Sequence, residues 1–152
     1  MQDKLRNIIL YIVKMYPFSK TLTITRIEKL IYLIDWEYVM RYKTQMTNIS
    51  WYFDHYGPYS SDVYNILHQD KDIKVQKDTS NFGTVRYVVE PRKDKDSLNY
   101  VGLSDKEIEV IDEVITNTRL LSWNQLINYV YATLPIREGK KHTYLNLEEF
   151  DI

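Results

Sequence analysis

The stretch TITRIEKLIYLIDWEYVMRY, residues 23–42, carries the most apolar helical pattern of the chain. Its large apolar side chains recur at three- and four-residue steps, the spacing that places residues on one face of an α-helix. They are Ile24, Ile27, Leu30, Ile31, Ile34 and Tyr38. The residues that lie off this stripe include Arg26, Glu28, Lys29 and Asp35. We expect a helix at the centre of the core, with Tyr32 and Trp36 at the margins of its buried face.

The segments on either side of this helix show different periods. Residues 2–15 repeat leucine and isoleucine at helical spacing and predict a first helix. Residues 48–56 alternate apolar and polar side chains, the two-residue rhythm of a strand with one covered face. We expect Gly57 and Pro58 to stop this strand, because the proline ring fixes φ and glycine tolerates positive φ. A short helix is predicted over residues 60–69, with a serine cap and an acidic first turn.

The second half of the chain holds a hairpin and two helices with clear start signals. Residues 72–90 contain two alternating segments around the turn-prone DTSNFG, which predicts a β-hairpin. Ser104 and Glu107 form a Ser-x-x-Glu capping box. Ser122 and Gln125 repeat this arrangement. Each pair predicts the start of a helix.

The C-terminal segment looks different from the rest. The last predicted helix covers residues 123–133 and ends before Pro135. Residues 137–152 show no periodicity and are expected to form a tail or strap beyond one domain over residues 1–136. The predicted fold class is therefore mainly α (α+β): a compact helical domain of about five helices, a small β-hairpin and an extended strand-like segment.

Composition argues against several kinds of chemistry. The chain has no cysteine, so it has no disulfide or thiolate site, and nothing in it requires an oxidising compartment. Its histidines, His55, His68 and His142, lack the short spacing of a metal site. Its four glycines form neither a P-loop nor a dinucleotide-binding fingerprint. We expect a cytoplasmic protein with no metal, no cofactor, no signal peptide and no membrane span.

Acidic residues gather on the helix that begins near residue 105. They are Glu107, Glu109, Asp112 and Glu113. Such a run at a capped helix start is usually a solvated face, because negative charge is favourable near the positive end of the helix dipole. A coherent negative surface can also hold a basic partner.

The stretch WYFDHYGPYS, residues 51–60, places five aromatic rings around one Gly-Pro. A strand buries one face, so Trp51 and Phe53 can pack inward while the three tyrosines need another environment. Tyrosine offers rigid contact area and a hydroxyl, which makes it frequent at protein interfaces. A purely structural role is the alternative for these tyrosines. The candidate partner-binding residues are Trp36, Tyr52, Tyr56, Gly57, Pro58 and Tyr59.

Two stretches together resemble a known family. RIEKLIYLIDWEYVMRY, residues 26–42, followed by ISWYFDHYGPYSSDVYNIL, residues 49–67, resembles the Panacea domain, the SocA-like antitoxin family. Its members carry a Lys-Leu-x-Tyr helix and a downstream Tyr-Gly-Pro before another helix. The resemblance covers about residues 5–136, including LSWNQLINYVYATLPI near the end. The matching motif residues are Lys29, Leu30, Tyr32, Trp51, Tyr56, Gly57, Pro58, Val63 and Tyr64.

This chain departs from many members of that family in one respect. Many place the tryptophan nearer to Gly-Pro and follow the proline with valine, whereas here five residues separate Trp51 from Gly57 and Tyr59 follows Pro58. The resemblance implies a mainly helical domain that binds protein, either neutralising a toxin or presenting it to a protease. The implied partner is a cognate toxin or a defence-related protein.

Nucleic-acid binding is the alternative function. In a winged-helix reading, helix 60–69 would enter the major groove and hairpin 72–90 would be the wing. The basic residues of that wing are Lys74, Lys77 and Arg86. Residues 71–95 carry seven basic and four acidic groups, a modest surplus. The proposed recognition helix has Asp62 and Asp70 but no lysine or arginine, which disfavours contact with phosphates.

An enzyme with a diffuse site is the third hypothesis. Asp54, His55 and Tyr56 could supply acid–base groups, since a carboxylate can orient an imidazole for proton transfer. Neighbours in a strand point to opposite faces, however, so Asp54 and His55 are not expected to pair through their side chains. We therefore expect a binding protein and no enzyme.

Overall fold

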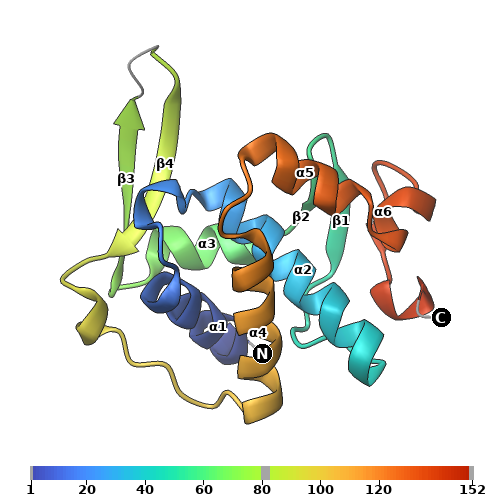
Figure 1. Ribbon diagram of the computed structural model, residues 1–152, viewed down its shortest axis with the longest axis horizontal. Helices are drawn as coiled ribbons and strands as arrows, with labels where there is room; N and C mark the ends of the chain where they lie inside the picture. Colours follow the sequence, from blue (N-terminus) through green and yellow to red (C-terminus); the bar gives the residue numbers. More distant parts are fainter. Residues whose placement is uncertain (1, 80–82, 151–152) are drawn as a thin grey trace.

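Helix α2 (Ile24–Tyr42) runs through the middle of the protein and contacts helices on several sides as well as parts of both sheets (Figure 1). The structure is a computed structural model that describes residues 2–79 and 83–150. Thr23 caps the start of α2 by accepting a hydrogen bond from the backbone N–H of Arg26. The apolar stripe of α2 is buried from Ile24 to Ile34, as its spacing predicts, and forms the centre of the core, while Tyr38 is partly buried.

Within the described residues, six α-helices and two small antiparallel sheets form the fold. The helices are α1 (Gln2–Met15), α2, α3 (Ser61–Gln69), α4 (Asp105–Thr118), α5 (Trp123–Tyr131) and α6 (Leu134–Glu138), with short 3-10 turns at Ser19–Thr21, Lys95–Ser97 and Leu147–Phe150. One sheet has the order β2-β1-β5, with β1 (Trp51–Asp54) between β2 (Gly57–Tyr59) and β5 (Tyr144–Leu145). The other is the hairpin of β3 (Ile73–Thr79) and β4 (Val85–Pro91).

The mainly helical α+β class predicted from the sequence is confirmed. Both predicted capping boxes are present: the Ser104 hydroxyl accepts from the Glu107 N–H, and that of Ser122 accepts from the Gln125 N–H. The β3–β4 hairpin projects away from the helices (Figure 1). Part of its predicted turn, residues 80–82, lies outside the described residues. No described helix has both the length and the apolar character needed to cross a membrane.

The prediction that Gly57 and Pro58 stop the strand is wrong. The chain turns at His55 and Tyr56 and returns as β2, in which Pro58 pairs with Phe53. Gly57 adopts a φ of +102°, a backbone conformation that glycine tolerates and that allows this tight turn to close. Proline is tolerated in β2 because this is an edge strand, where one missing N–H breaks no sheet ladder.

The prediction that Pro135 ends the last helix is also wrong. Helix α5 ends at Tyr131, and Pro135 lies in the first turn of a further helix, α6. A proline in a first turn costs no hydrogen bond, because the N–H groups there have no partner within the helix.

The segment after α6 returns to the core. Strand β5 pairs with β1, so that Leu145 lies opposite Trp51. Leu145 and Leu147 are buried, and Phe150 packs against the core. Gly139 fits between the Pro135 backbone and the Leu145 side chain, where an added Cβ would lie 2.3 Å from the Pro135 carbonyl oxygen.

The acidic residues of α4 do not form one solvated face as expected. Glu107 is buried and pairs with Lys4 of α1, while the Tyr11 hydroxyl of α1 donates to Asp112. Arg41 of α2 pairs with Glu113 and lies 4.0 Å from Glu109. Helix α4 contacts both α1 and α2. Its carboxylates therefore pair with a lysine and a tyrosine on α1 and with an arginine on α2.

Candidate functional site

Neighbouring residues of α2 hold strand β2 by its backbone. The Lys29 ammonium donates to the Pro58 carbonyl oxygen at 2.8 Å. Glu28 accepts from the backbone N–H of Ser60 at 2.9 Å. Both side chains are buried, although they lie off the apolar stripe of their helix, because β2 and the start of α3 cover this side of α2. These two contacts give hydrogen-bond partners to the Pro58 carbonyl on the edge strand and to the Ser60 N–H directly before α3.

The next turns of α2 fix the other strand of this hairpin. The Tyr32 and Trp51 rings meet edge to face with centroids 5.6 Å apart, and the Tyr32 hydroxyl bonds Thr133 at 2.8 Å. The Trp51 indole N–H donates to Asp35 at 2.9 Å. Residues from the Lys-Leu-x-Tyr helix therefore contact both strands that flank the Tyr-Gly-Pro turn. The two sequence motifs form one buried structural unit.

Gly57→Ala should destabilise the fold by about 2 kcal/mol, because φ of +102° strains any residue with a Cβ. The new methyl would also lie 3.4 Å from the Tyr131 ring. Gly102→Ala is the matched control, since Gly102 has φ of +72° and open space around it. We expect it to cost about 1 kcal/mol. Urea unfolding of both variants measures the difference; equal losses would contradict the special role of Gly57.

Above the Glu28–Lys29 pair lies an open cavity of about 370 Å³. It lies among the start of α2, the β1–β2 turn, α3 and β4, and the turn and the β3–β4 hairpin rise on the same side of the molecule (Figure 1). It is lined by Ile24, Thr25, Glu28, Lys29, Asp54, Tyr56, Gly57, Tyr59, Tyr64 and Tyr87. Tyr56 is 78% exposed, so the cavity has an aromatic rim facing solvent.

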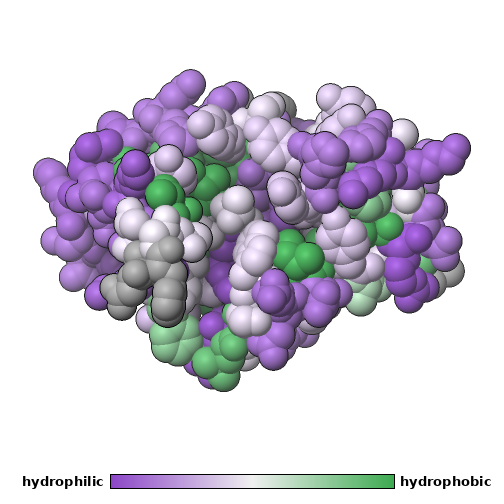
Figure 2. Space-filling model, turned by 90° about the horizontal axis from the view of Figure 1, so that it is seen from above, coloured by the Kyte–Doolittle hydropathy of each residue, from purple (hydrophilic) through white to green (hydrophobic). Residues whose placement is uncertain are grey.

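A second cavity, of about 430 Å³, adjoins the first one. Tyr59 and Asp54 line both cavities, and Tyr52 and Tyr144 line the second. The rings of Tyr52 and Tyr144 meet with centroids 5.1 Å apart. We call this region the tyrosine surface; it comprises Tyr52, Tyr56, Tyr59, Tyr64, Tyr87 and Tyr144. In the view from above the molecule, pale and green residues interrupt the purple hydrophilic ones near the β3–β4 hairpin (Figure 2).

Burial perturbs the ionisable groups beneath this surface. It raises the pKa of Glu28 to about 7, with a further rise from Asp54, opposed by the Ser60 N–H and the Lys29 ammonium. Burial lowers the pKa of Lys29, opposed by the charges of Glu28 and Asp54. The pKa of Tyr59 is raised by burial and by Glu28, Tyr64 and Asp54. The floor of the cavity is thus a cluster of coupled charges.

The six candidate residues chosen from sequence do not form one site. Tyr56, Gly57 and Tyr59 line the first cavity, and Tyr52 lines the second. Pro58 is buried and acts through its carbonyl oxygen on Lys29. Trp36 is 6% exposed and lies elsewhere, so the expectation that it is buried is met, and only its edge can contact a partner.

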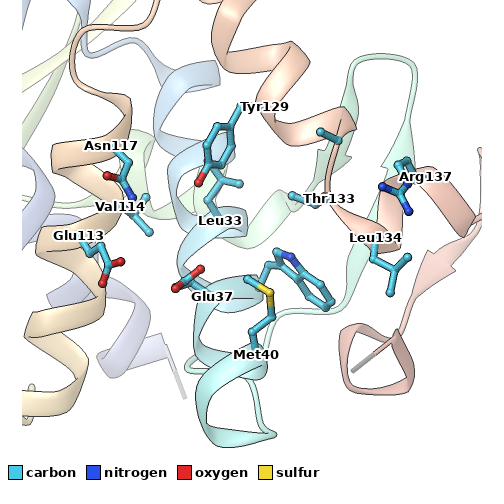
Figure 3. A pocket seen from close by; sticks show the side chains of 12 residues that line it. Leu33, Glu37, Met40, Glu113, Val114, Asn117, Tyr129, Thr133, Leu134 and Arg137 are labelled. Carbon is cyan, nitrogen blue, oxygen red and sulfur yellow. The ribbon is translucent and has the colours of Figure 1, made fainter. Parts of the chain in front are cut away.

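Trp36 lines a separate open groove of about 660 Å³ among α2, α4, α5 and α6 (Figure 3). Its other apolar lining includes Leu33, Met40, Val114 and Leu134. Glu37 and Glu113 point toward each other at one end, with Arg137 at the other (Figure 3). Arg41 pairs with both of these carboxylates, so part of the negative charge at this end of the groove is already compensated.

The acid–base hypothesis for Asp54 and His55 finds no geometric support. Asp54 accepts the backbone N–H of His55 at 2.8 Å, and the His55 ring packs on His142, with centroids 5.0 Å apart. A carboxylate cannot orient the imidazole from this arrangement. Among the residues that the structure describes, no group of three or more His, Asp or Glu side chains could hold a metal ion.

Sequence reasoning missed several residues of this region. Tyr87 and Tyr144 come from β4 and β5, and no local pattern links them to the Gly-Pro turn, while Tyr64 of α3 was a motif residue but not a candidate for partner binding. Glu28 and Lys29 were placed off the apolar stripe, which normally means solvent. A signal for them existed, because Lys29 belongs to the motif that carries the resemblance to the Panacea domain.

Comparison with known families identifies the class of this protein. The model of the antitoxin SocA-like family, Panacea domain, matches residues 27–134, which include most of α2, both strands of the Tyr-Gly-Pro hairpin and α5. The chain therefore belongs to the SocA-like antitoxin family. No curated protein and no solved structure shows a significant match to this chain.

Proposed function

We propose that this chain is a cytoplasmic antitoxin-like module that binds a partner protein and has no chemistry of its own. The partner is a toxin or a defence-related protein, which the module neutralises directly or presents to a protease. The observation that carries the proposal is the tyrosine surface of a chain that belongs to an antitoxin family. On this surface the side chains of Tyr56 and Tyr144 are 78% and 71% exposed. Exposed tyrosines grouped on a rigid scaffold are typical of protein interfaces.

The scaffold beneath the surface supports this function. Glu28 and Lys29 fix the β1–β2 hairpin by its backbone, so Tyr56 and Tyr59 are presented on a held turn. A surface that is ordered before binding loses less conformational entropy when the partner docks. The same hairpin is paired with β5 on its other side, which places Tyr144 beside Tyr52.

Co-purification tests the proposal. A tagged chain, co-expressed with the protein encoded by the neighbouring gene, should retain that protein in stoichiometric amount at moderate salt. Tyr56→Ala should weaken capture about tenfold, since a central tyrosine is a frequent hot spot. Tyr129→Ala is the matched control, because Tyr129 is an exposed tyrosine on the separate groove. If Tyr129→Ala alone weakened capture, the interface would be that groove.

DNA binding is the alternative, favoured by the hairpin that projects beside α3 (Figure 1). Its charges argue against it. Arg86 pairs with Asp78 and Lys74 with Glu90 across the strands, so two of the three basic residues of the wing are already neutralised. DNA that co-purifies and is lost steeply as salt rises would reverse this ranking.

A further inference from the structure

The first cavity of the tyrosine surface combines aromatic rings with negative charge. Tyr56, Tyr59, Tyr64 and Tyr87 line it together with the carboxylates of Glu28 and Asp54. A tyrosine ring attracts cations through its negative face, and the phenol oxygen accepts hydrogen bonds from them. At about 370 Å³ the cavity is within the size range of small-ligand pockets. The chemistry of this lining is complementary to a cation.

Neither carboxylate has a cationic partner in the part of the chain that the structure describes. Within residues 2–79 and 83–150, no Lys, Arg or His nitrogen lies within 4.0 Å of a carboxylate oxygen of Glu28 or Asp54. Glu28 is 3% exposed, and its carboxylate accepts a hydrogen bond from the Ser60 N–H. Buried carboxylates are normally paired, so an unpaired one beside an open cavity is an unusual arrangement.

Among the described residues of the lining, Lys29 is the one cation, and its ammonium is already hydrogen-bonded to the backbone. Its ammonium donates to the Pro58 carbonyl oxygen at 2.8 Å, on the backbone of β2. Two carboxylates against one ammonium leave the lining with a net negative charge when all three groups are ionised. A second cation can therefore enter without displacing Lys29.

We propose that this cavity binds a lysine or arginine side chain of the partner protein, held between the tyrosine rings and paired with Glu28 and Asp54. The proposal rests on the protein-binding function proposed above and names the residue type that anchors the partner. A side chain is the expected source of the cation because the cavity opens within the tyrosine surface, so the chain that carries the cation can extend across Tyr52 and Tyr144. A long basic side chain also brings apolar methylenes to the rings.

The charge of Glu28 should make this binding pH-dependent. Because burial raises the pKa of Glu28 to about 7, the carboxylate is mostly neutral at pH 6 and charged at pH 8. The titratable groups that face the cavity with it are Lys29 on α2, Asp54 on β1, Tyr56 on the β1–β2 turn, Tyr59 on β2, Tyr64 on α3 and Tyr87 on β4. The raised pKa of Glu28, about 7, lies between pH 6 and pH 8, and burial raises the pKa of Tyr59 away from this window. Cation binding should strengthen between pH 6 and pH 8.

The test uses the full chain and a defined probe. N-acetyl-lysine methylamide is titrated into isotopically labelled protein at pH 8 and at pH 6, with NMR shifts of Tyr56, Tyr59 and Ser60 as the readout. We expect saturable, millimolar binding, and no comparable shifts with the neutral norleucine analogue. Glu28→Gln should weaken binding of the lysine probe about tenfold, because the probe loses a hydrogen bond to a charged group. The Gln side chain can still accept from the Ser60 N–H, so the hydrogen bond that holds the backbone between β2 and α3 is kept.

Asp54→Asn is the second variant, because Asn can still accept from the His55 N–H at this partly exposed site. It should weaken the probe about threefold. Equal binding of the neutral analogue, or unchanged binding in both variants, would overturn the proposal. Spermidine is the third probe: if it bound more than about a hundredfold tighter than the lysine probe, the cavity would be a site for a free polycation and the proposal would fail.

The two proposals can fail separately. If Tyr56→Ala weakens capture of the partner protein while the lysine probe does not bind, the protein-binding function stands and the cation site is refuted. If the probe binds as expected while no protein is captured with the chain, the chemistry of the cavity stands and the partner function is refuted, and with it the assignment of the cation to a partner.

Discussion

Asp35→Ala is expected to lower the free energy of unfolding by about 4 kcal/mol, because it leaves several buried donors without an acceptor. Asp35 is 0% exposed and lies on α2 opposite the loop that leads into β1. It accepts from the backbone N–H of Thr47 at 2.9 Å, from the Thr47 hydroxyl at 2.6 Å, from the Trp51 indole at 2.9 Å and from Gln45 at 3.2 Å. The loop after α2 is organised around this one carboxylate.

The balance of forces on Asp35 explains the size of this effect. Burial raises the pKa of Asp35 to about 6, and the hydrogen bonds from Thr47 and Trp51 oppose that rise. The hydrogen-bond donors therefore stabilise the charged form of Asp35, which is costly to bury away from water. Alanine removes that cost but leaves the donors facing an apolar void, and domains of this kind have roughly 5–15 kcal/mol of stability to lose.

Urea unfolding followed by far-UV circular dichroism measures this loss. The midpoint should fall with little change in slope, as expected when stability changes but the surface exposed on unfolding does not. Glu109→Ala is the matched control, because the Glu109 side chain is 71% exposed, and its cost should stay within about 0.5 kcal/mol. An Asp35→Ala variant as stable as this control would show that the network does not organise the loop.

The sequence predicts those parts of the fold that local signals control. Helix α1 has its predicted bounds, and the capping boxes at Ser104 and Ser122 start α4 and α5 as expected. Strand β2 was missed because its three residues contain Gly-Pro, a local stop signal, and the strand exists only through pairing with β1 and the Lys29 contact to Pro58. Tertiary contacts override local propensity here.

Tertiary contacts also explain why charged residues of α2 are buried. Arg26, like Glu28 and Lys29, lies off the apolar stripe and is nevertheless buried. Its guanidinium donates to the carbonyl oxygens of Thr118 and Leu121, so it satisfies groups at the end of α4. An amphipathic pattern assumes one covered face, whereas α2 is covered on several sides and its charged residues serve the backbones of neighbouring elements.

The residues that carry the family resemblance are mainly structural. Lys29, Tyr32, Trp51 and Pro58 are buried and join α2 to the β1–β2 hairpin. The six tyrosines of the tyrosine surface come from five separate strands or helices and the β1–β2 turn, and four of the six are not among the matching motif residues. A motif match thus identifies the architecture from sequence, while the surface that would select a partner becomes visible only in the folded protein.

Glu28 should make the protein more stable in acid than at alkaline pH, relative to a Glu28→Gln variant. Burial raises its pKa from 4.5 to about 7 in the folded protein, because the charged form is costly to bury. A raised carboxyl pKa contributes stability that is complete below the unfolded value of 4.5 and is lost as pH rises through about 7. At 1.36 kcal/mol per pH unit, the full loss is about 3 kcal/mol.

Glu28→Gln removes this titration and keeps an acceptor for the Ser60 N–H. The difference in unfolding free energy between variant and wild type therefore reports the titration of Glu28 alone. That difference should rise by about 3 kcal/mol in favour of the variant between pH 4.5 and pH 8. Asp35, whose pKa is also raised, titrates in both proteins and cancels. Glu109→Gln, at an exposed position, should show a difference that is flat with pH. A flat profile for Glu28→Gln as well would mean that the buried carboxylate is fully compensated by Lys29, and the unpaired charge beneath the tyrosine surface would not exist.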